Sequence, residues 1–219
     1  MIVEKRIERI ESDKKKGRKI DEDEYALLRS SLGILEAGNS LRDIPELASS
    51  PLLRGYTFLS AKPVLVLFNN ADEDDVFPDW VKTEKKLNAI VVRGALEMEL
   101  ATMSPEDTAE FLTVFDIHDI ARHRVIQRSY ELLGLISFFT VGEDEVKAWT
   151  VKKGTIALDA ADVIHSDIKK GFIRAEVLAY DDLIKSGSYQ EAKKGGLVRL
   201  EGKEYPVKDG DIIYFRFNI

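Results

Sequence analysis

The chain has 219 residues, 44% hydrophobic and 32% charged, a composition typical of a folded globular protein. It contains no cysteine, which excludes disulfides, cysteine-ligated metal centres and a cysteine nucleophile. The three histidines do not have the number and spacing of a zinc site, so we expect no metal. No apolar run approaches the roughly 20 residues of a membrane-spanning helix, and we expect neither a membrane partner nor a secretory signal.

Charge is distributed unevenly along the chain, whose net charge is -7. Residues 1–20 hold eight Lys or Arg and four Asp or Glu, whereas residues 21–135 hold 11 basic and 21 acidic side chains. The long-range field of the whole chain repels a polyanion. Any RNA partner must therefore meet a local basic patch.

The first 38 residues predict an antiparallel helical hairpin. Val3, Ile7 and Ile10 are spaced four and then three apart, and Leu28, Leu32 and Leu35 repeat that coiled-coil spacing. We expect helices from residue 1 to about 16 and from about 21 to 37, broken by Gly17 and ended by Gly38. Because the apolar side chains of the two helices have the same spacing, we expect each helix to bury its apolar face against the other helix alone. The connecting turn, here called the hairpin tip, carries the most basic cluster of the chain: Lys14, Lys15, Lys16, Arg18 and Lys19.

The middle of the chain predicts an α/β segment. Residues 63–68 form a continuous apolar run, as in a strand buried on both faces, and residues 89–92 form a second. We expect a helix ending near residue 87 between these strands, which would make them a parallel crossover pair. Further helices are expected from Pro105, which follows the capping residue Ser104, and from about 119 to 133.

The last 85 residues have a different sequence pattern, which predicts short strands separated by turn residues. We expect strands at 136–140, 146–150, 173–177 and 212–217, and helices near 159–165 and 180–186. A sheet of four or five strands crossed by a helix is typical of a β-grasp module. The predicted fold class is therefore α+β. Its parts are a helical, coiled-coil hairpin at 1–50, an α/β segment at 51–134 and the β-grasp domain at 135–219.

Several segments resemble the YchF/Obg-like ATPase family. In the last third they are Ser129–Thr140, Val146–Thr155, Val163–Ile173 and Asp209–Ile213, which are similar to the TGS-like C-terminal domain of that family. Upstream, Val3–Arg9 resembles the start of its helical insertion and Ala61–Leu65 the strand after it. The resemblance covers essentially the whole chain but begins in the middle of the family pattern, so the α/β segment reads as the remnant of a P-loop-type domain.

The resemblance also bears on catalysis. Full-length members use ATP or GTP with Mg²⁺ and carry a G-x-x-x-x-G-K-[ST] loop, which is not in this sequence. That loop supplies the backbone amides, lysine and hydroxyl that stabilise phosphoryl transfer. We therefore expect this chain alone to hydrolyse no nucleotide, and we assign it no catalytic residue and no cofactor.

A base-reading element is predicted at Asn69 and Asp72. These residues follow the first strand, where the family has Asn-x-x-Glu and related GTPases have Asn-Lys-x-Asp. A carboxylate at 72 would accept hydrogen bonds from guanine and would disfavour adenine. The alternative is that Asn and Asp simply form a turn after the strand. Arg93-Gly94-Ala95, which replaces a small Ser-Ala-Lys-like loop of the family, favours that alternative.

A second set of candidates, here called the C-terminal basic group, lies in the TGS-like part. Its members are Lys152, Lys153, His165, Lys169, Lys170 and Arg174, which we expect at or beside strand ends near Trp149 and Phe172. Cations beside aromatic rings can hold RNA phosphates and stack a base. The alternative is that the aromatic residues belong to the core and that His165 is a hydrogen-bonded structural residue.

Three functions remain open at this point. The resemblance implies the C-terminal binding portion of a translation-associated protein, which meets the ribosome or its RNA in the cytoplasm, with no DNA partner. The first alternative is a fragment of a GTP- or ATP-binding hydrolase that retains weak nucleotide binding at Asn69 and Asp72. The second is a scaffold that pairs its hairpin with another protein.

Overall fold

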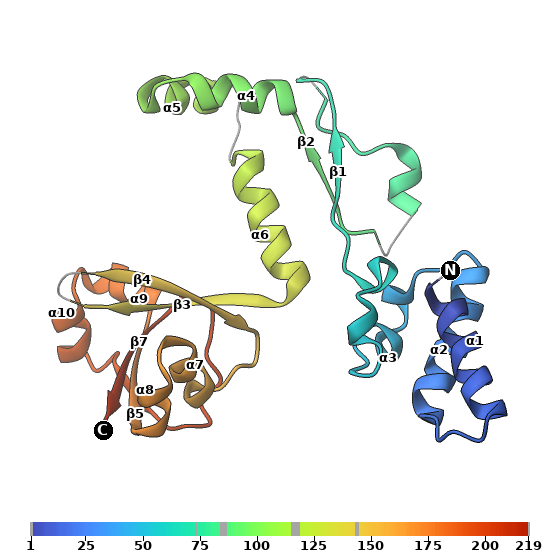
Figure 1. Ribbon diagram of the computed structural model, residues 1–219. Coiled ribbons are helices and arrows are strands. Elements are labelled where there is room, and N and C mark those ends of the chain that lie inside the picture. The colour runs from blue at the N-terminus through green and yellow to red at the C-terminus, as the bar shows by residue number, and fades with distance from the viewer. Residues whose placement is uncertain (1, 73, 84–86, 115–118, 143–144, 219) are drawn as a thin grey trace. The chain divides into compact units, whose positions relative to one another are not determined.

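The structure is a computed structural model, which describes residues 2–72, 74–83, 87–114, 119–142 and 145–218 (Figure 1). Contacts divide the chain into two compact units, Met1–Val64 and Leu65–Ile219. Helices and strands occur together in a mixed α+β fold. Within the described ranges, no helix is both long and apolar enough to cross a bilayer.

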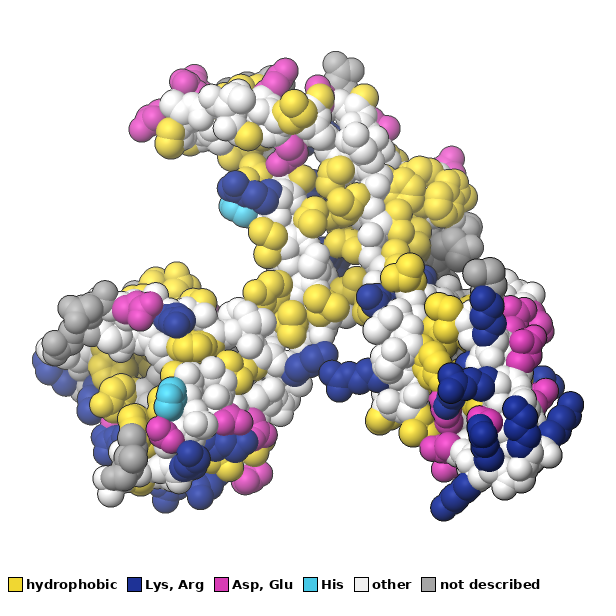
Figure 2. Space-filling model, viewed as in Figure 1, with side chains coloured by type: hydrophobic (Ala, Val, Ile, Leu, Met, Phe, Trp, Pro, Cys, Tyr) yellow, Lys and Arg dark blue, Asp and Glu magenta, His cyan; other side chains and the backbone are white. Residues whose placement is uncertain are grey.

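The first unit begins with the predicted helical hairpin. Helix α1 (Ile2–Lys15) and helix α2 (Glu22–Glu36) lie side by side, and their outward faces carry the charges (Figures 1 and 2). Val3, Ile7 and Ile10 are all buried, which confirms the spacing read from the sequence. Asp21 fixes the start of α2, since its carboxylate accepts hydrogen bonds from the N–H groups of residues 23 and 24 at 3.1 and 3.0 Å.

The segment after the hairpin corrects one expectation. The apolar faces of α1 and α2 are not buried by each other alone, because this segment packs against them as well. A chain of short helices follows: η1 (Leu41–Asp43), α3 (Pro45–Ala48), η2 (Arg54–Tyr56) and η3 (Leu59–Ala61). Leu41, Leu47 and Leu53 from this segment share one hydrophobic core with α1 and α2. The spacing of apolar residues within a helix does not predict this packing, because the side chains that pack on the helices are single leucines from short helices and turns.

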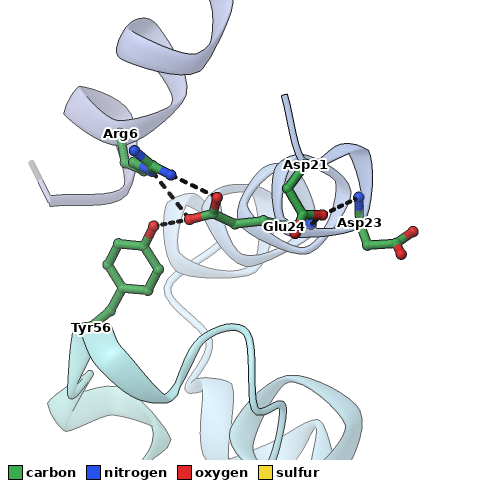
Figure 3. Close-up of polar contacts among 5 residues, drawn as sticks. All are labelled: Arg6, Asp21, Asp23, Glu24 and Tyr56. Carbon is green, nitrogen blue, oxygen red and sulfur yellow. Dashed lines mark hydrogen bonds and ion pairs between the residues drawn. The ribbon is translucent and has the colours of Figure 1, made fainter. Parts of the chain in front are cut away.

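One polar network ties these three parts of the first unit together (Figure 3). Arg6 on α1 donates two hydrogen bonds to the Glu24 carboxylate on α2, at 3.1 and 2.7 Å. The hydroxyl of Tyr56, from the segment after the hairpin, donates to the same carboxylate. The hydrogen bond from Arg6 lowers the pKa of Glu24; partial burial opposes the shift, and the Tyr56 hydroxyl adds to it.

The second unit begins with two parallel strands and three helices. Strand β1 (Val66–Asn69) pairs with β2 (Ala89–Val92) from Val66 beside Ala89 to Asn69 beside Val92. Helices α4 (Gly94–Thr102), α5 (Pro105–Val114) and α6 (Ala121–Leu133) follow. Strand β1 is half-exposed, with Leu67 at 47%, so the expectation of a strand buried on both faces is wrong. Helix α4 begins directly at the glycine for which a loop was expected.

Two side chains, one at the end of β1 and one just after it, hold the start of α4. The amide N–H of Gly94 donates to Asn69 Oδ1 at 2.9 Å, and that of Leu96 donates to Asp72 Oδ1 at 3.0 Å. A Cβ at position 94 would lie only 2.8 Å from Asn69 Oδ1, so a side chain there would push the Asn69 amide away from this contact. The side chains thus satisfy N–H groups that the helix itself leaves without acceptors.

The connection between β1 and β2 contains a 3-10 helix, η4 (Asp79–Thr83), where a longer helix to residue 87 was expected. Residues 84–86 of that expected helix lie outside the described residues.

Five strands between Leu135 and Phe217 form a sheet with the strand order β4-β3-β7-β5-β6. Its strands are β3 (Leu135–Val141), β4 (Val146–Lys152), β5 (Phe172–Ala179), β6 (Arg199–Glu201) and β7 (Asp211–Phe217). β3 and β7 are parallel, and the other neighbours are antiparallel. The four predicted strands are confirmed, whereas β6 lies in a segment for which the sequence indicated no element.

The two faces of this sheet carry different helices. On the first face, α7 (Ala157–Ile164) packs with Phe138, Val177 and Phe215 in the main core. On the second face, α9 (Tyr180–Ser186) and α10 (Tyr189–Lys194) contribute Leu183 and Ala192 to a smaller core with Leu178 and Ile212. The expected helix at 159–165 is therefore α7, which starts two residues earlier. A separate helix, α8 (Ser166–Lys170), follows it.

The network of Arg6, Glu24 and Tyr56 generates a pH-dependent prediction. Replacing Glu24 by Gln removes the charge that Arg6 binds, so we expect the first unit to lose about 1–2 kcal/mol of stability at neutral pH. Because the folded pKa of Glu24 is depressed, its contribution is present above the unfolded pKa of about 4.3 and is lost as pH falls through the folded value. Hydrogen exchange of α1 and α2 amides measures both effects.

Glu36→Gln is the matched control for that variant, because Glu36 is exposed and no ion pair of its side chain is present among the described residues. Two results would contradict the role given to Glu24: equal protection of the two variants at neutral pH, or a difference in protection that does not shrink as the pH falls below the unfolded pKa of about 4.3.

The tie between Asp72 and α4 generates a second prediction. Asp72→Ala leaves the Leu96 N–H without its acceptor, so exchange of amides in the first turn of α4 should become about three- to thirtyfold faster. Asp75→Ala, an exposed change in the same connection, should leave these amides unchanged. If both variants exchange like the parent chain, Asp72 does not hold the helix.

Candidate functional site

The hairpin tip is fully exposed and only partly neutralised. Lys14 pairs with Glu22 at 2.9 Å and Arg18 pairs with Asp13 at 2.8 Å, and the hydrogen bond that Lys14 donates to Glu22 raises the pKa of Lys14. Among the described residues, no ion pair involves the remaining three tip cations, which are Lys15, Lys16 and Lys19. Figure 2 shows Lys and Arg side chains gathered over the hairpin. The tip therefore presents three unpaired cations and two that a stronger anion could recruit.

The turn itself holds these cations close together. Gly17 adopts a φ of 71°, and the N–H of Arg18 donates to the carbonyl of Asp13, which closes the end of α1. Asp21 then starts α2 immediately. Only a short, fixed connection separates Lys14 from Lys19, so several tip cations can contact the same stretch of backbone phosphates.

Part of the C-terminal basic group is neutralised within the domain. Lys169 pairs with Asp159 at 3.0 Å and with Asp162 at 3.1 Å, and these hydrogen bonds raise its pKa. Lys170 pairs with Asp167 at 3.1 Å, and this hydrogen bond lowers the pKa of Asp167. Both lysines lie in the last turn of α8 rather than at a strand end, a correction that follows from the helix missed by the sequence analysis.

His165 has a structural contact. It lies between α7 and α8, and its Nδ1 accepts a hydrogen bond from the N–H of Asp167 at 3.2 Å, which caps α8. This contact favours the structural alternative for His165.

The other members of the C-terminal basic group remain unpaired in the described chain. Lys152 ends β4, Lys153 follows it, and Arg174 lies on β5. Phe172 is buried, and Trp149 packs against the main core while donating to Thr140 Oγ1 at 2.9 Å. These aromatic rings therefore serve the core, as the structural alternative stated, and the residue that stacks on Trp149 is Lys147, 4.2 Å from the ring centroid.

Asn69 and Asp72, the candidate base-binding pair, lie at the carboxyl end of β1. One oxygen of each side chain is already occupied by an N–H group at the start of α4. Arg93 Nη1 also donates to the Asp72 carbonyl at 3.1 Å. These contacts favour a structural role for both residues, and base recognition stays a prediction. Among the described residues, no group of three or more acidic or histidine side chains has the arrangement of a metal site.

One polar cluster on the second face of the C-terminal sheet was not predicted. Glu176 on β5 is 5% exposed, and its carboxylate accepts hydrogen bonds from Tyr189, at 2.8 Å, and from Arg216. Lys193 lies 3.6 Å away. Burial opposes ionisation of Glu176, but these three partners outweigh it and lower its pKa. The signal in the sequence was a charged residue between Ala175 and Val177 in an apolar strand.

The comparisons with known proteins agree on one family. Residues 135–218 match the family model YchF-GTPase_C, described as "Protein of unknown function (DUF933)". The chain is 40% identical over 223 residues to the ribosome-binding ATPase YchF of Haemophilus ducreyi, covering 99% of this chain and 61% of that protein. It is 38% identical over 227 residues to the protein of the same name from Bacillus subtilis, with coverages of 99% and 62%.

A solved structure supports the same assignment. The YchF GTPase of Schizosaccharomyces pombe superimposes with a TM-score of 0.79 and 27% sequence identity, covering 98% of this chain and 61% of that one. The chain thus spans less than two thirds of the length of these relatives. The resemblance first seen in short motifs extends over the full sequence and the fold, and the chain belongs to the YchF family.

Proposed function

We propose that this chain is a ribosome-associating portion of a YchF-type, translation-associated protein, and that the hairpin tip contacts ribosomal RNA. The observation that carries the proposal is the set of three exposed tip lysines with no ion pair in the described chain. Relatives that share 38–40% of their residues with it are named ribosome-binding ATPases. In this proposal the protein works in the cytoplasm, together with the ribosomes.

The contact is electrostatic in this proposal. Lysines bind backbone phosphates without reading sequence and release condensed counterions as they do so. The tip supplies up to five such contacts once the ion pairs of Lys14 with Glu22 and of Arg18 with Asp13 are broken. Lys152 and Lys153 form a weaker second contact, because they are only two adjacent cations and Lys169 and Lys170 of their group are already paired.

The proposal also assigns the architecture. The strand order β4-β3-β7-β5-β6, with α7 across one face, supports a TGS-like β-grasp module. The parallel pair β1–β2 with α4 supports a remnant of a GTPase-like α/β domain. The proposed domains are residues 1–50, 51–134 and 135–219. Residues 51–61, at the start of the second, pack on the hairpin of the first.

Nucleotide hydrolysis is proposed as a property of the longer relatives. The 219 residues contain no G-x-x-x-x-G-K-[ST] motif, so these residues by themselves lack the phosphate cradle that phosphoryl transfer requires. Weak nucleotide binding at Asn69 and Asp72 is the second candidate. It is disfavoured because both side chains hold α4.

The proposal predicts the effect of reversing the unpaired tip charges. Replacing Lys15, Lys16 and Lys19 by Glu should weaken association with purified ribosomes about tenfold or more at low salt, because three phosphate contacts become repulsive. Co-sedimentation at a series of ribosome concentrations measures the change.

The matched control reverses three exposed cations elsewhere, Lys62, Arg122 and Lys185, which also have no ion pair among the described residues. It imposes the same change of net charge. Equal weakening in both variants would show that only net charge matters, and unchanged binding in the tip variant would exclude the tip as the contact.

A further inference from the structure

The second face of the C-terminal sheet contains a cavity of about 770 Å³. Its apolar lining includes Val141 on β3, Ile212 on β7 and Leu183 on α9. Tyr214 also lines the cavity and is 62% exposed. A volume of this size accepts one or two bulky apolar side chains.

Cations gather at this cavity in excess of the carboxylates that face them. Arg216 and Lys193 line it, and Arg174 lies directly opposite Arg216 in the pairing of β5 with β7, so both guanidinium groups are on the same face. Like charges at directly opposite positions destabilise a sheet. The buried Glu176 is the one carboxylate of the cavity lining within the described chain, and it pairs with Arg216 and Lys193.

The buried carboxylate positions these cations rather than cancelling them. Burying Glu176 costs desolvation that an apolar residue at the same place would avoid. In return, it fixes Arg216 and Lys193 beside the apolar lining, while 48% of the Arg216 side chain and 58% of the Lys193 side chain stay exposed. Two cations and one carboxylate line the cavity, and Arg174 lies on the same face of the sheet, which leaves a local excess of positive charge in a chain whose net charge is -7.

We propose that this face is a docking site for an acidic peptide segment of a partner protein, which places an apolar side chain in the cavity and a carboxylate against Arg174, Arg216 and Lys193. RNA fits less well, because nucleic-acid grooves spread their cations along a backbone track. Here Arg216 and Lys193 lie beside one apolar hollow, and Arg174 lies on the same face of the sheet. The inference is independent of the ribosome contact at the hairpin tip.

The test titrates the isotope-labelled chain of 219 residues with short synthetic peptides and follows its backbone amides by NMR. The probe carries Asp and Glu on both sides of a Leu-Phe pair; one control peptide has Lys at the acidic positions, and another has Ser in place of Leu-Phe. We expect the probe to shift amides of β7, α9 and α10 saturably with a dissociation constant at or below about 1 mM. Both control peptides should bind more weakly.

Arg174→Gln is the discriminating variant, because no hydrogen bond or ion pair of the Arg174 side chain is present among the described residues, and the neutral amide puts no new carboxylate opposite Arg216. It should weaken binding of the acidic probe about three- to tenfold. Lys203→Gln, which removes an exposed charge elsewhere in the same domain, should not. Tyr214→Ala tests the apolar contact of the peptide with the cavity and should also weaken binding of the acidic probe.

Three results would overturn the proposal. The first is the absence of saturable shifts at these amides with the acidic probe up to about 5 mM. The second is equal binding of the acidic and lysine peptides. The third is an RNA oligonucleotide that shifts the same amides at lower concentration than the acidic peptide, which would assign this face to RNA.

Discussion

Ion pairing within the chain decides which basic side chains are available to an outside anion. Lys169 and Lys170 look as basic in the sequence as Lys15 and Lys16, yet α8 brings the first pair onto carboxylates of its own domain. The turn between α1 and α2 leaves the second pair exposed and without such partners in the described chain. The functional difference between two lysine pairs thus follows from the backbone that carries them.

Ion pairs within the chain also hold the two basic surfaces, the hairpin tip and the cavity face of the C-terminal sheet, in place. The Arg6–Glu24–Tyr56 network joins both hairpin helices to the segment that follows them, so the tip extends from a fixed base (Figure 3). In the C-terminal domain, Glu176 fixes Arg216 and Lys193 beside an apolar cavity. One partly buried carboxylate in each unit therefore orders cations, at the cost of its own hydration.

Local patterns in the sequence predicted what depends on local physics. The spacing of Val3, Ile7 and Ile10 predicted the hairpin seam, and the alternation after residue 135 predicted four of the five sheet strands. Contacts distant in sequence could not be predicted this way, and they include the packing of Leu41 on the hairpin and the use of Asn69 as an acceptor for Gly94. For the site, the basic residues were found from composition alone, but their pairing required the fold.

The central claim is that the chain meets the ribosome through tip cations, and the salt dependence of ribosome association tests it most directly. Three to five phosphate contacts predict that the logarithm of the association constant falls with the logarithm of salt concentration with a slope of about -2 to -5. The measurement is the binding of the unaltered chain to purified ribosomes across a series of salt concentrations. A slope near zero would contradict the account, because it would indicate an apolar protein contact in place of phosphate neutralisation.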